Sequence, residues 1–365
     1  MPGEAETGAP PPRANPDLVG HEAAERALRQ LFVSGRMPHA LLLTGPRGVG
    51  KATLAYRLAR FVLAGPEVAG AGSGDDLAVP PDSGVFRRVA AGGHADLLTV
   101  ERAYDPRRRR MRSEIVVDDA REIGGFLRLT SAEGGWRVVV VDGADEMNRN
   151  AANAFLKILE EPPQRTLLLL VAHSPGLLLP TIRSRCRRFP LQALGSDLVR
   201  ELLARYRPEL GADQRDAIVR LACGSIGRAL DLAAAGGLDL YRSLLALLAR
   251  RQGVDPTALQ TLADRLARPE ADNSYRALEE LLRYLLARVA VAAARRQAAR
   301  GEGAAATGGE TETAVIARLA ERAAADTWAG LQDEIGHAFA RADGLNLDRK
   351  QTILGAVFAI DRAAR

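Results

Sequence analysis

The chain has 365 residues, of which 47% are hydrophobic and only 4% aromatic, and its formal net charge is +5. This length can bury the cores of two or three domains, and the low aromatic content favours helices packed through leucine and alanine. No run of about eighteen uninterrupted apolar residues occurs, and the N-terminus lacks a basic-then-apolar leader. We therefore expect a cytoplasmic protein of several domains with no membrane partner.

The first ordered elements are expected after a tail over residues 1–14, which is rich in proline, glycine and glutamate and is predicted to be disordered. Residues 40–44 are short, apolar and followed by glycine, which predicts a buried strand. Residues 51–63 then predict a helix. A strand, a glycine-rich turn and a helix in this order are typical of a phosphate-binding loop.

The turn itself reads Gly45-Pro-Arg-Gly-Val-Gly-Lys51. Its glycines, Gly45, Gly48 and Gly50, allow backbone N–H groups to converge on a polyphosphate at the positive end of the helix. Lys51 would reach the terminal phosphates. This pattern predicts a nucleotide site, and a coincidental glycine-rich turn is the plainer alternative.

The residue after the lysine departs from the pattern. A P-loop enzyme needs a Ser or Thr hydroxyl there to bind magnesium, and this chain has Ala52. Thr53 is no simple replacement, because one residue along a helix is a rotation of about 100°. We therefore predict a degenerate site with no metal ligand, which still permits ATP or ADP binding without hydrolysis.

Residues 65–84 are rich in Gly, Ala, Pro and Asp and predict a loop. Further along, Arg107-Arg-Arg-Arg110 and Arg112 form a basic patch that invites a DNA-binding interpretation. No aromatic residues interleave with these arginines for base stacking. Whether the Arg107–Arg112 patch touches DNA is left open; such contact would be sequence-independent and would weaken with salt.

A second buried strand is predicted over residues 136–142 and ends in Asp142, the usual place for the magnesium-organising aspartate of a P-loop enzyme. Gly143 follows, where hydrolases of this class usually have a glutamate that polarises water. Asp145 and Glu146 lie near the start of the next helix, where carboxylates suit the helix dipole. The site thus lacks a base as well as a metal ligand.

Several segments resemble the bacterial clamp-loader ATPase (AAA+) family. They are 17–21 (DLVGH), 38–45 (PHALLLTG), 142–163 (DGADEMNRNAANAFLKILEEPP) and 180–186 (PTIRSRC), and the match covers roughly residues 13–235. The resemblance implies an α/β P-loop core with a parallel sheet, a small helical lid and an all-α C-terminal collar domain. We expect these over residues 15–190, 191–236 and 237–365.

The departures from this family's motor subunits agree with one another. Motor subunits have an arginine in a Gly-Ser-x-Arg sensor, whereas here Gly224-Ser225-Ile226-Gly227 has glycine in that place and Arg228 comes one residue late. This pattern is similar to the family's stationary, non-motor member, so we predict no ATPase turnover by the chain itself. By the same resemblance, Arg185 in Ser184-Arg185-Cys186 is a catalytic residue acting in trans on a neighbour's phosphates. A solvated basic turn is the alternative.

The resemblance also implies partners and cofactors. The chain would sit in a hetero-oligomeric ring with the motor subunits and the delta subunit of DNA polymerase III, and through that complex meet the sliding clamp and primer–template DNA. Relatives often carry a four-cysteine zinc module after the P-loop helix. The only two cysteines, Cys186 and Cys223, lie elsewhere and indicate a reducing compartment, so we expect no zinc.

Two other functions stay open. An autonomous P-loop ATPase acting on DNA would need Thr53 and Asp145 to supply the metal and water chemistry. A free-standing nucleic-acid-binding protein would bind DNA in a salt-sensitive way without partners.

Overall fold

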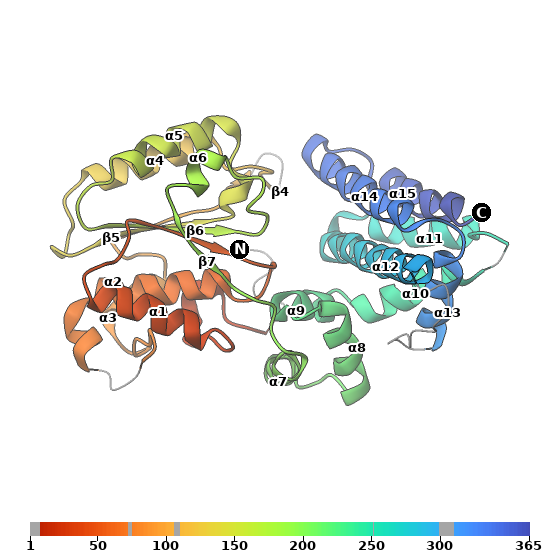
Figure 1. Ribbon diagram of the computed structural model, residues 1–365, viewed down its shortest axis with the longest axis horizontal. Helices are drawn as coiled ribbons and strands as arrows, with labels where there is room; N and C mark the ends of the chain where they lie inside the picture. Colours follow the sequence, from red (N-terminus) through yellow and green to blue (C-terminus); the bar gives the residue numbers. More distant parts are fainter. Residues whose placement is uncertain (1–7, 72–74, 106–109, 251, 299–309) are drawn as a thin grey trace. The chain divides into compact units, whose positions relative to one another are not determined.

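The computed structural model describes residues 8–71, 75–105, 110–250, 252–298 and 310–365. The chain divides into two compact units (Figure 1). Unit 1 comprises Met1–Tyr206 with Cys223–Arg228, and unit 2 comprises Arg207–Ala222 with Ala229–Arg365. This division cuts through the segment expected to form a lid, and the three-domain scheme stays a prediction.

Unit 1 is built on a five-stranded parallel sheet with strand order β2-β5-β6-β1-β7. The strands are β1 (Ala40–Thr44), β2 (Leu97–Val100), β5 (Arg137–Asp142), β6 (Thr166–Ala172) and β7 (Arg187–Pro190). The two strands predicted over 40–44 and 136–142 are confirmed as β1 and β5. Their apolar runs were informative because parallel strands that are covered on both faces are rich in apolar residues without alternation. A separate two-stranded antiparallel sheet pairs β3 (Tyr104–Asp105) with β4 (Arg110–Met111).

Alternate residues of each strand point into two cores, one on each face of the sheet. Leu41 and Leu43 of β1 join the first core, whereas Ala40 and Leu42 join the second. Helices α1, α2 and α3 cover the first face and α4, α5 and α6 the second (Figure 1). This layered arrangement confirms the predicted α/β P-loop core with a parallel sheet.

The helical segments of unit 1 are η1 (Pro12–Ala14), α1 (Glu22–Val33), α2 (Lys51–Ala71), α3 (Gly84–Ala90), α4 (Val117–Arg128), η2 (Ala144–Glu146), α5 (Arg149–Glu160), α6 (Pro180–Arg183), α7 (Ser196–Tyr206) and the start of α9 (Ile226–Ala234). The side chain of Asn148 accepts a hydrogen bond from the Ala151 N–H and so caps the N-terminus of α5. The four residues of α5 that face the second core are buried: Ala151, Ala152, Phe155 and Leu159.

Two expectations differ from the structure. The loop predicted over residues 65–84 is wrong in part, because α2 continues to Ala71 across a kink at Gly65, whose φ of 79° no helix interior adopts. Of the tail predicted to be disordered over 1–14, residues 1–7 lie outside the described part, whereas Pro12–Ala14 form a 3-10 turn. The buried guanidinium of Arg60 donates to the carbonyls of Arg13 and Asn15, which ties this turn to α2.

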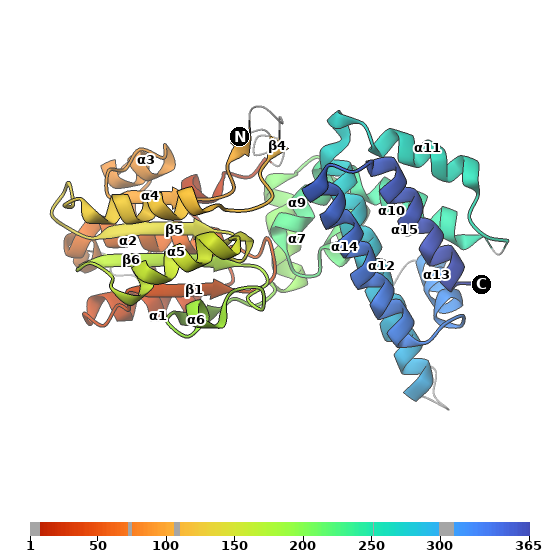
Figure 2. The same cartoon turned by 90° about the horizontal axis from the view of Figure 1, so that it is seen from above.

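Helices are the regular elements that the described residues of unit 2 form. This unit contains α8 (Ala212–Ala222), the rest of α9, α10 (Gly237–Ala249), α11 (Pro256–Leu266), η3 (Pro269–Ala271), α12 (Asp272–Ala298), α13 (Glu310–Ala320), α14 (Ala325–Leu345) and α15 (Arg349–Ala363). The long helices α12 and α14 pack side by side (Figure 2). Residues 299–309, between α12 and α13, lie outside the described residues.

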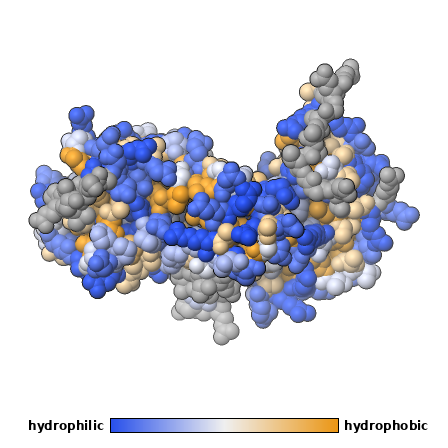
Figure 3. All heavy atoms as spheres, turned by 90° about the horizontal axis from the view of Figure 1, so that it is seen from below, coloured by the Kyte–Doolittle hydropathy of each residue, from blue (hydrophilic) through white to orange (hydrophobic). Residues whose placement is uncertain are grey.

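The face drawn in Figure 3 is mostly hydrophilic with scattered hydrophobic patches. Across the described ranges, no single helix is long and apolar enough to cross a membrane, although the bent pair α9 and α10, at 79°, passes the same test of length and composition together.

Candidate nucleotide site and arginine donor

The predicted P-loop lies where β1 ends and α2 begins. Parallel strands bring their carboxyl ends to one edge of a sheet, and ligands of open α/β folds bind there. Gly45 has a φ of 142°, and a Cβ on it would lie 2.2 Å from the carbonyl oxygen of Leu191. Only glycine fits at this position, so the first glycine of the motif has a demonstrable steric reason.

Lys51 is turned into the loop. Its buried ammonium donates to the carbonyl oxygens of Gly45 at 2.8 Å and Pro46 at 2.6 Å. Burial lowers the pKa of Lys51 to about 8, against the opposing effect of the carboxylates of Asp142 and Asp145. The lysine thus satisfies loop carbonyls in the position that the motif assigns to phosphate binding.

The two positions after the lysine lie in the first turn of α2. Ala52 is half-buried, and Thr53 on the next position of α2 is only 8% exposed. A hydroxyl packed inside the unit is poorly placed to reach a metal at the mouth of the loop.

Asp142 ends β5, on the same sheet edge as the P-loop. Burial, reinforced by the nearby carboxylates of Glu101 and Glu146, raises its pKa to about 6. The folded protein therefore disfavours the charged form of this side chain relative to the unfolded chain.

We expect Asp142→Asn to raise the free energy of unfolding at pH 8 by about 1 to 3 kcal/mol. The sign follows from the raised pKa. Above the unfolded value of 3.8, the carboxyl is ionised in the unfolded chain, and burying that charge lowers the free energy of unfolding of the wild type. The gain should shrink as pH falls through 6 and vanish below about 4. Urea unfolding of both forms across this range, without magnesium, measures it; a difference that does not change with pH would contradict the assignment.

Asp145 has a structural use that the sequence did not reveal. It lies in η2, and its carboxylate accepts from the backbone N–H of His173 at 3.1 Å and of Ser174 at 2.6 Å. These bonds hold the segment after β6. Burial, with the Lys51 ammonium next in effect, lowers the pKa of His173 to about 4, which keeps its imidazole neutral at pH 7.

The start of α9 lies directly against the P-loop. The Ser225 hydroxyl donates to the carbonyl oxygen of Arg47 at 2.7 Å, and the Gly227 N–H donates to that of Gly48 at 2.9 Å. A Cβ on Gly227 would lie 2.7 Å from the Cα of Gly48. While this contact holds, the position that carries arginine in motor subunits has no room for a side chain.

Arg185 lies outside this cluster, just after α6. Its neighbours in the chain, Ile182 and Cys186, are buried in the second core, and burial raises the pKa of the Cys186 thiol to about 12. The Arg185 side chain is 37% exposed and forms an ion pair with Glu160 at 2.8 Å. The buried side chains of Ile182 and Cys186 thus fix the backbone on either side of the exposed Arg185.

The basic patch is described only in part. Residues 107–109 lie outside the described residues, while the Arg112 N–H donates to the Ala103 carbonyl beside the β3–β4 pair. In the described part of the chain, no group of three or more His, Cys, Asp or Glu side chains could hold a metal ion.

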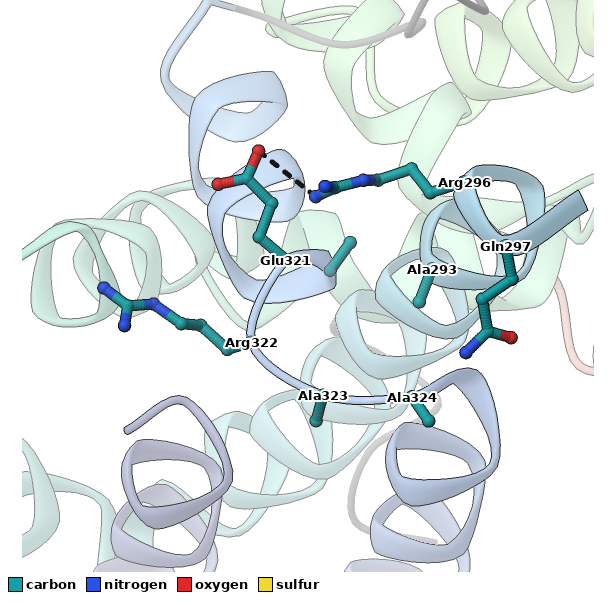
Figure 4. Close-up of a pocket in the computed structure, with 8 residues that line it drawn as sticks. Ala293, Arg296, Gln297, Glu321, Arg322, Ala323 and Ala324 are labelled. Carbon is teal, nitrogen blue, oxygen red and sulfur yellow. Dashed lines mark ion pairs between the residues drawn. The ribbon is translucent and has the colours of Figure 1, made fainter. Parts of the chain in front are cut away.

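A pocket in unit 2 lies between the end of α12 and the turn from α13 to α14 (Figure 4). Its lining includes an ion pair between Arg296 and Glu321 at 3.1 Å and several alanines. It contains none of the predicted site residues.

Comparisons with known proteins agree with the motifs. The family model described as "DNA polymerase III, delta subunit" matches residues 20–195. The chain is 39% identical to DNA polymerase III subunit delta' of Pseudomonas aeruginosa over 198 residues, 54% of this chain and 56% of that protein. It is 29% identical to DNA polymerase III subunit gamma/tau of Mycobacterium tuberculosis over 74% of this chain and 46% of that protein. The chain thus spans about half the length of the curated relatives it matches.

Among solved structures, a DNA polymerase III gamma subunit-related protein from Thermotoga maritima aligns over 93% of this chain and 99% of its own, with 20% identity and a TM-score of 0.38. The clamp-loader resemblance predicted from the motifs is confirmed by the family match and the delta' relative. Residues 20–195, just under half of the chain, match the DNA polymerase III delta subunit family model, and the chain is similar to delta-prime clamp-loader subunits.

Proposed function

We propose that this chain is the stationary subunit of a DNA polymerase III clamp loader. It helps to place the sliding clamp on primed DNA, and it donates Arg185 to the ATP site of a neighbouring motor subunit. Its partners in this proposal are the motor subunits and the delta subunit, in a hetero-oligomeric ring.

The observation that carries the non-motor role is the state of the chain's own P-loop. Ala52 offers no metal ligand, and Lys51 is engaged with the carbonyls of Gly45 and Pro46. The start of α9 is hydrogen-bonded to the loop through Ser225 and Gly227. These contacts within and against the P-loop support a structural role for this domain, without ATP hydrolysis by this chain.

An autonomous ATPase is the second candidate, and the geometry opposes it. Asp145, the carboxylate that would have to polarise water, already accepts hydrogen bonds from two backbone N–H groups. Thr53, which would have to bind magnesium, is buried.

Magnesium-dependent ATP hydrolysis separates these two functions. We expect the isolated chain to show no turnover above its Lys51→Met variant, with or without primed DNA, because the loop lacks its metal ligand. In the reconstituted loader, Lys51→Met should leave DNA-stimulated turnover unchanged. Hydrolysis by the isolated chain that disappears in Lys51→Met would make it a motor and overturn the proposal.

A further inference from the structure

We propose that Glu160 is the positioning residue for Arg185, holding its guanidinium ready for the phosphates of a neighbouring subunit. This inference rests on the proposed role of Arg185 as a donor in trans. It assigns a function to a carboxylate that lies 25 positions away in the sequence and belongs to a different element.

The first argument is the way in which the guanidinium is held. Nη2 of Arg185 lies 2.8 Å from Oε1 of Glu160, and Nη1 donates to the carbonyl oxygen of Thr181 at 3.0 Å. Each terminal nitrogen carries two N–H groups, so one on each stays available to a phosphate. Glu160 and the Thr181 carbonyl can therefore orient the Arg185 guanidinium and still leave N–H donors for a phosphate.

The second argument is that both partners stand on rigid supports. Glu160 is the last residue of α5, whose Phe155 and Leu159 are buried in the second core. Arg185 lies between the buried Ile182 and Cys186 of the same core. A long arginine side chain loses much rotamer freedom when it is ordered, and a fixed carboxylate brings about that ordering before the partner arrives.

The third argument is that stability gives no reason for the pair. The side chains of Arg185 and Glu160 are 37% and 50% exposed, and exposed ion pairs contribute little to folding. A carboxylate is also disfavoured at the C-terminal end of a helix, where the dipole is negative. Glu160 occupies that disfavoured position and points its charge at the one arginine that the motif singles out.

The test is a double-mutant cycle in the fully reconstituted loader. Rapid-quench ATP hydrolysis is followed in four forms: wild type, Glu160→Gln, Arg185→Ala and the double variant. The hydrolysis phase that Arg185→Ala removes reports the neighbour's site. Glu161→Gln is the matched control, because it removes the same charge one residue later, at a carboxylate that shows no ion pair among the described residues.

We expect Glu160→Gln to lower the rate constant of that phase by about 10- to 100-fold, with the KM for ATP unchanged, since a misdirected donor costs transition-state contacts. Glu161→Gln should match wild type, and Glu160→Gln should change nothing further once Arg185 is alanine. Thermal unfolding should be the same in all forms, which separates positioning from folding.

A Glu160→Gln loader whose rate constant equals or exceeds that of wild type would overturn the inference. A rate constant above wild type would mean that Glu160 restrains Arg185. An equal loss in the Arg185→Ala background would also overturn it, because Glu160 would then act by another route. If Arg185→Ala itself leaves every phase intact, the proposed function fails, and this outcome is distinct from a failure of Glu160 alone.

Discussion

In a reconstituted loader, Arg185→Ala is expected to slow ATP hydrolysis at the adjoining motor site by about 10³- to 10⁵-fold. The guanidinium would stabilise charge on the transferred phosphoryl group, and this factor corresponds to roughly 4 to 7 kcal/mol of barrier. Rapid-quench experiments with labelled ATP should lose the hydrolysis phase of one site while the other motor sites keep theirs.

Arg183→Ala provides a matched control for this experiment. Arg183 is an exposed arginine two residues earlier, and its guanidinium donates to the Pro175 carbonyl at 3.4 Å. It should leave all phases intact, and loader assembly measured by gel filtration should be the same for both variants. An Arg185→Ala loader with every phase at full rate would exclude a donor role for this arginine.

Phe155→Ala is expected to lower the free energy of unfolding of unit 1 by about 3 to 5 kcal/mol. Phe155 is fully buried in the second core, where it holds α5 on the sheet, and truncation leaves a cavity that rigid strands cannot fill. Lys157→Ala, on the exposed face of the same helix, should change stability by less than about 0.5 kcal/mol.

The measurement can be confined to unit 1 because the chain has only two tryptophans, Trp136 in unit 1 and Trp328 in unit 2. In a Trp328→Phe background, urea unfolding followed by fluorescence reports Trp136, which packs against the first core beside Phe32. A loss below about 1 kcal/mol for Phe155→Ala would show that α5 is not anchored through this side chain.

The parts of the core that could be predicted from sequence are those fixed by local chemistry. Continuous Leu and Val runs over 40–44 and 136–142 predict strands buried on both faces, and the structure has both. The glycine-rich turn and the carboxylate of Asp142 then follow from the ends of these strands. The segment over residues 191–236, expected to be a helical lid, contains the helices α7, α8 and α9.

The rest depends on contacts between distant segments, which periodicity does not encode. The hydroxyl of Ser225 meets the Arg47 carbonyl across 178 positions, and Glu160 meets Arg185 between two elements. The turning of Lys51 into loop carbonyls has no sequence signal at all. Glycine at 227 gave the one hint, since its absent side chain is what allows the close approach to Gly48.

The two cysteines differ sharply in their surroundings. Cys186 is buried, and its pKa of about 12 leaves almost no thiolate at neutral pH, whereas Cys223 is exposed immediately before the segment that closes the P-loop. A maleimide dye should therefore label the native chain at Cys223 alone. The protein thus offers a ready attachment point for a fluorophore beside the loop-closing segment, so that its opening can be followed without engineering a new thiol.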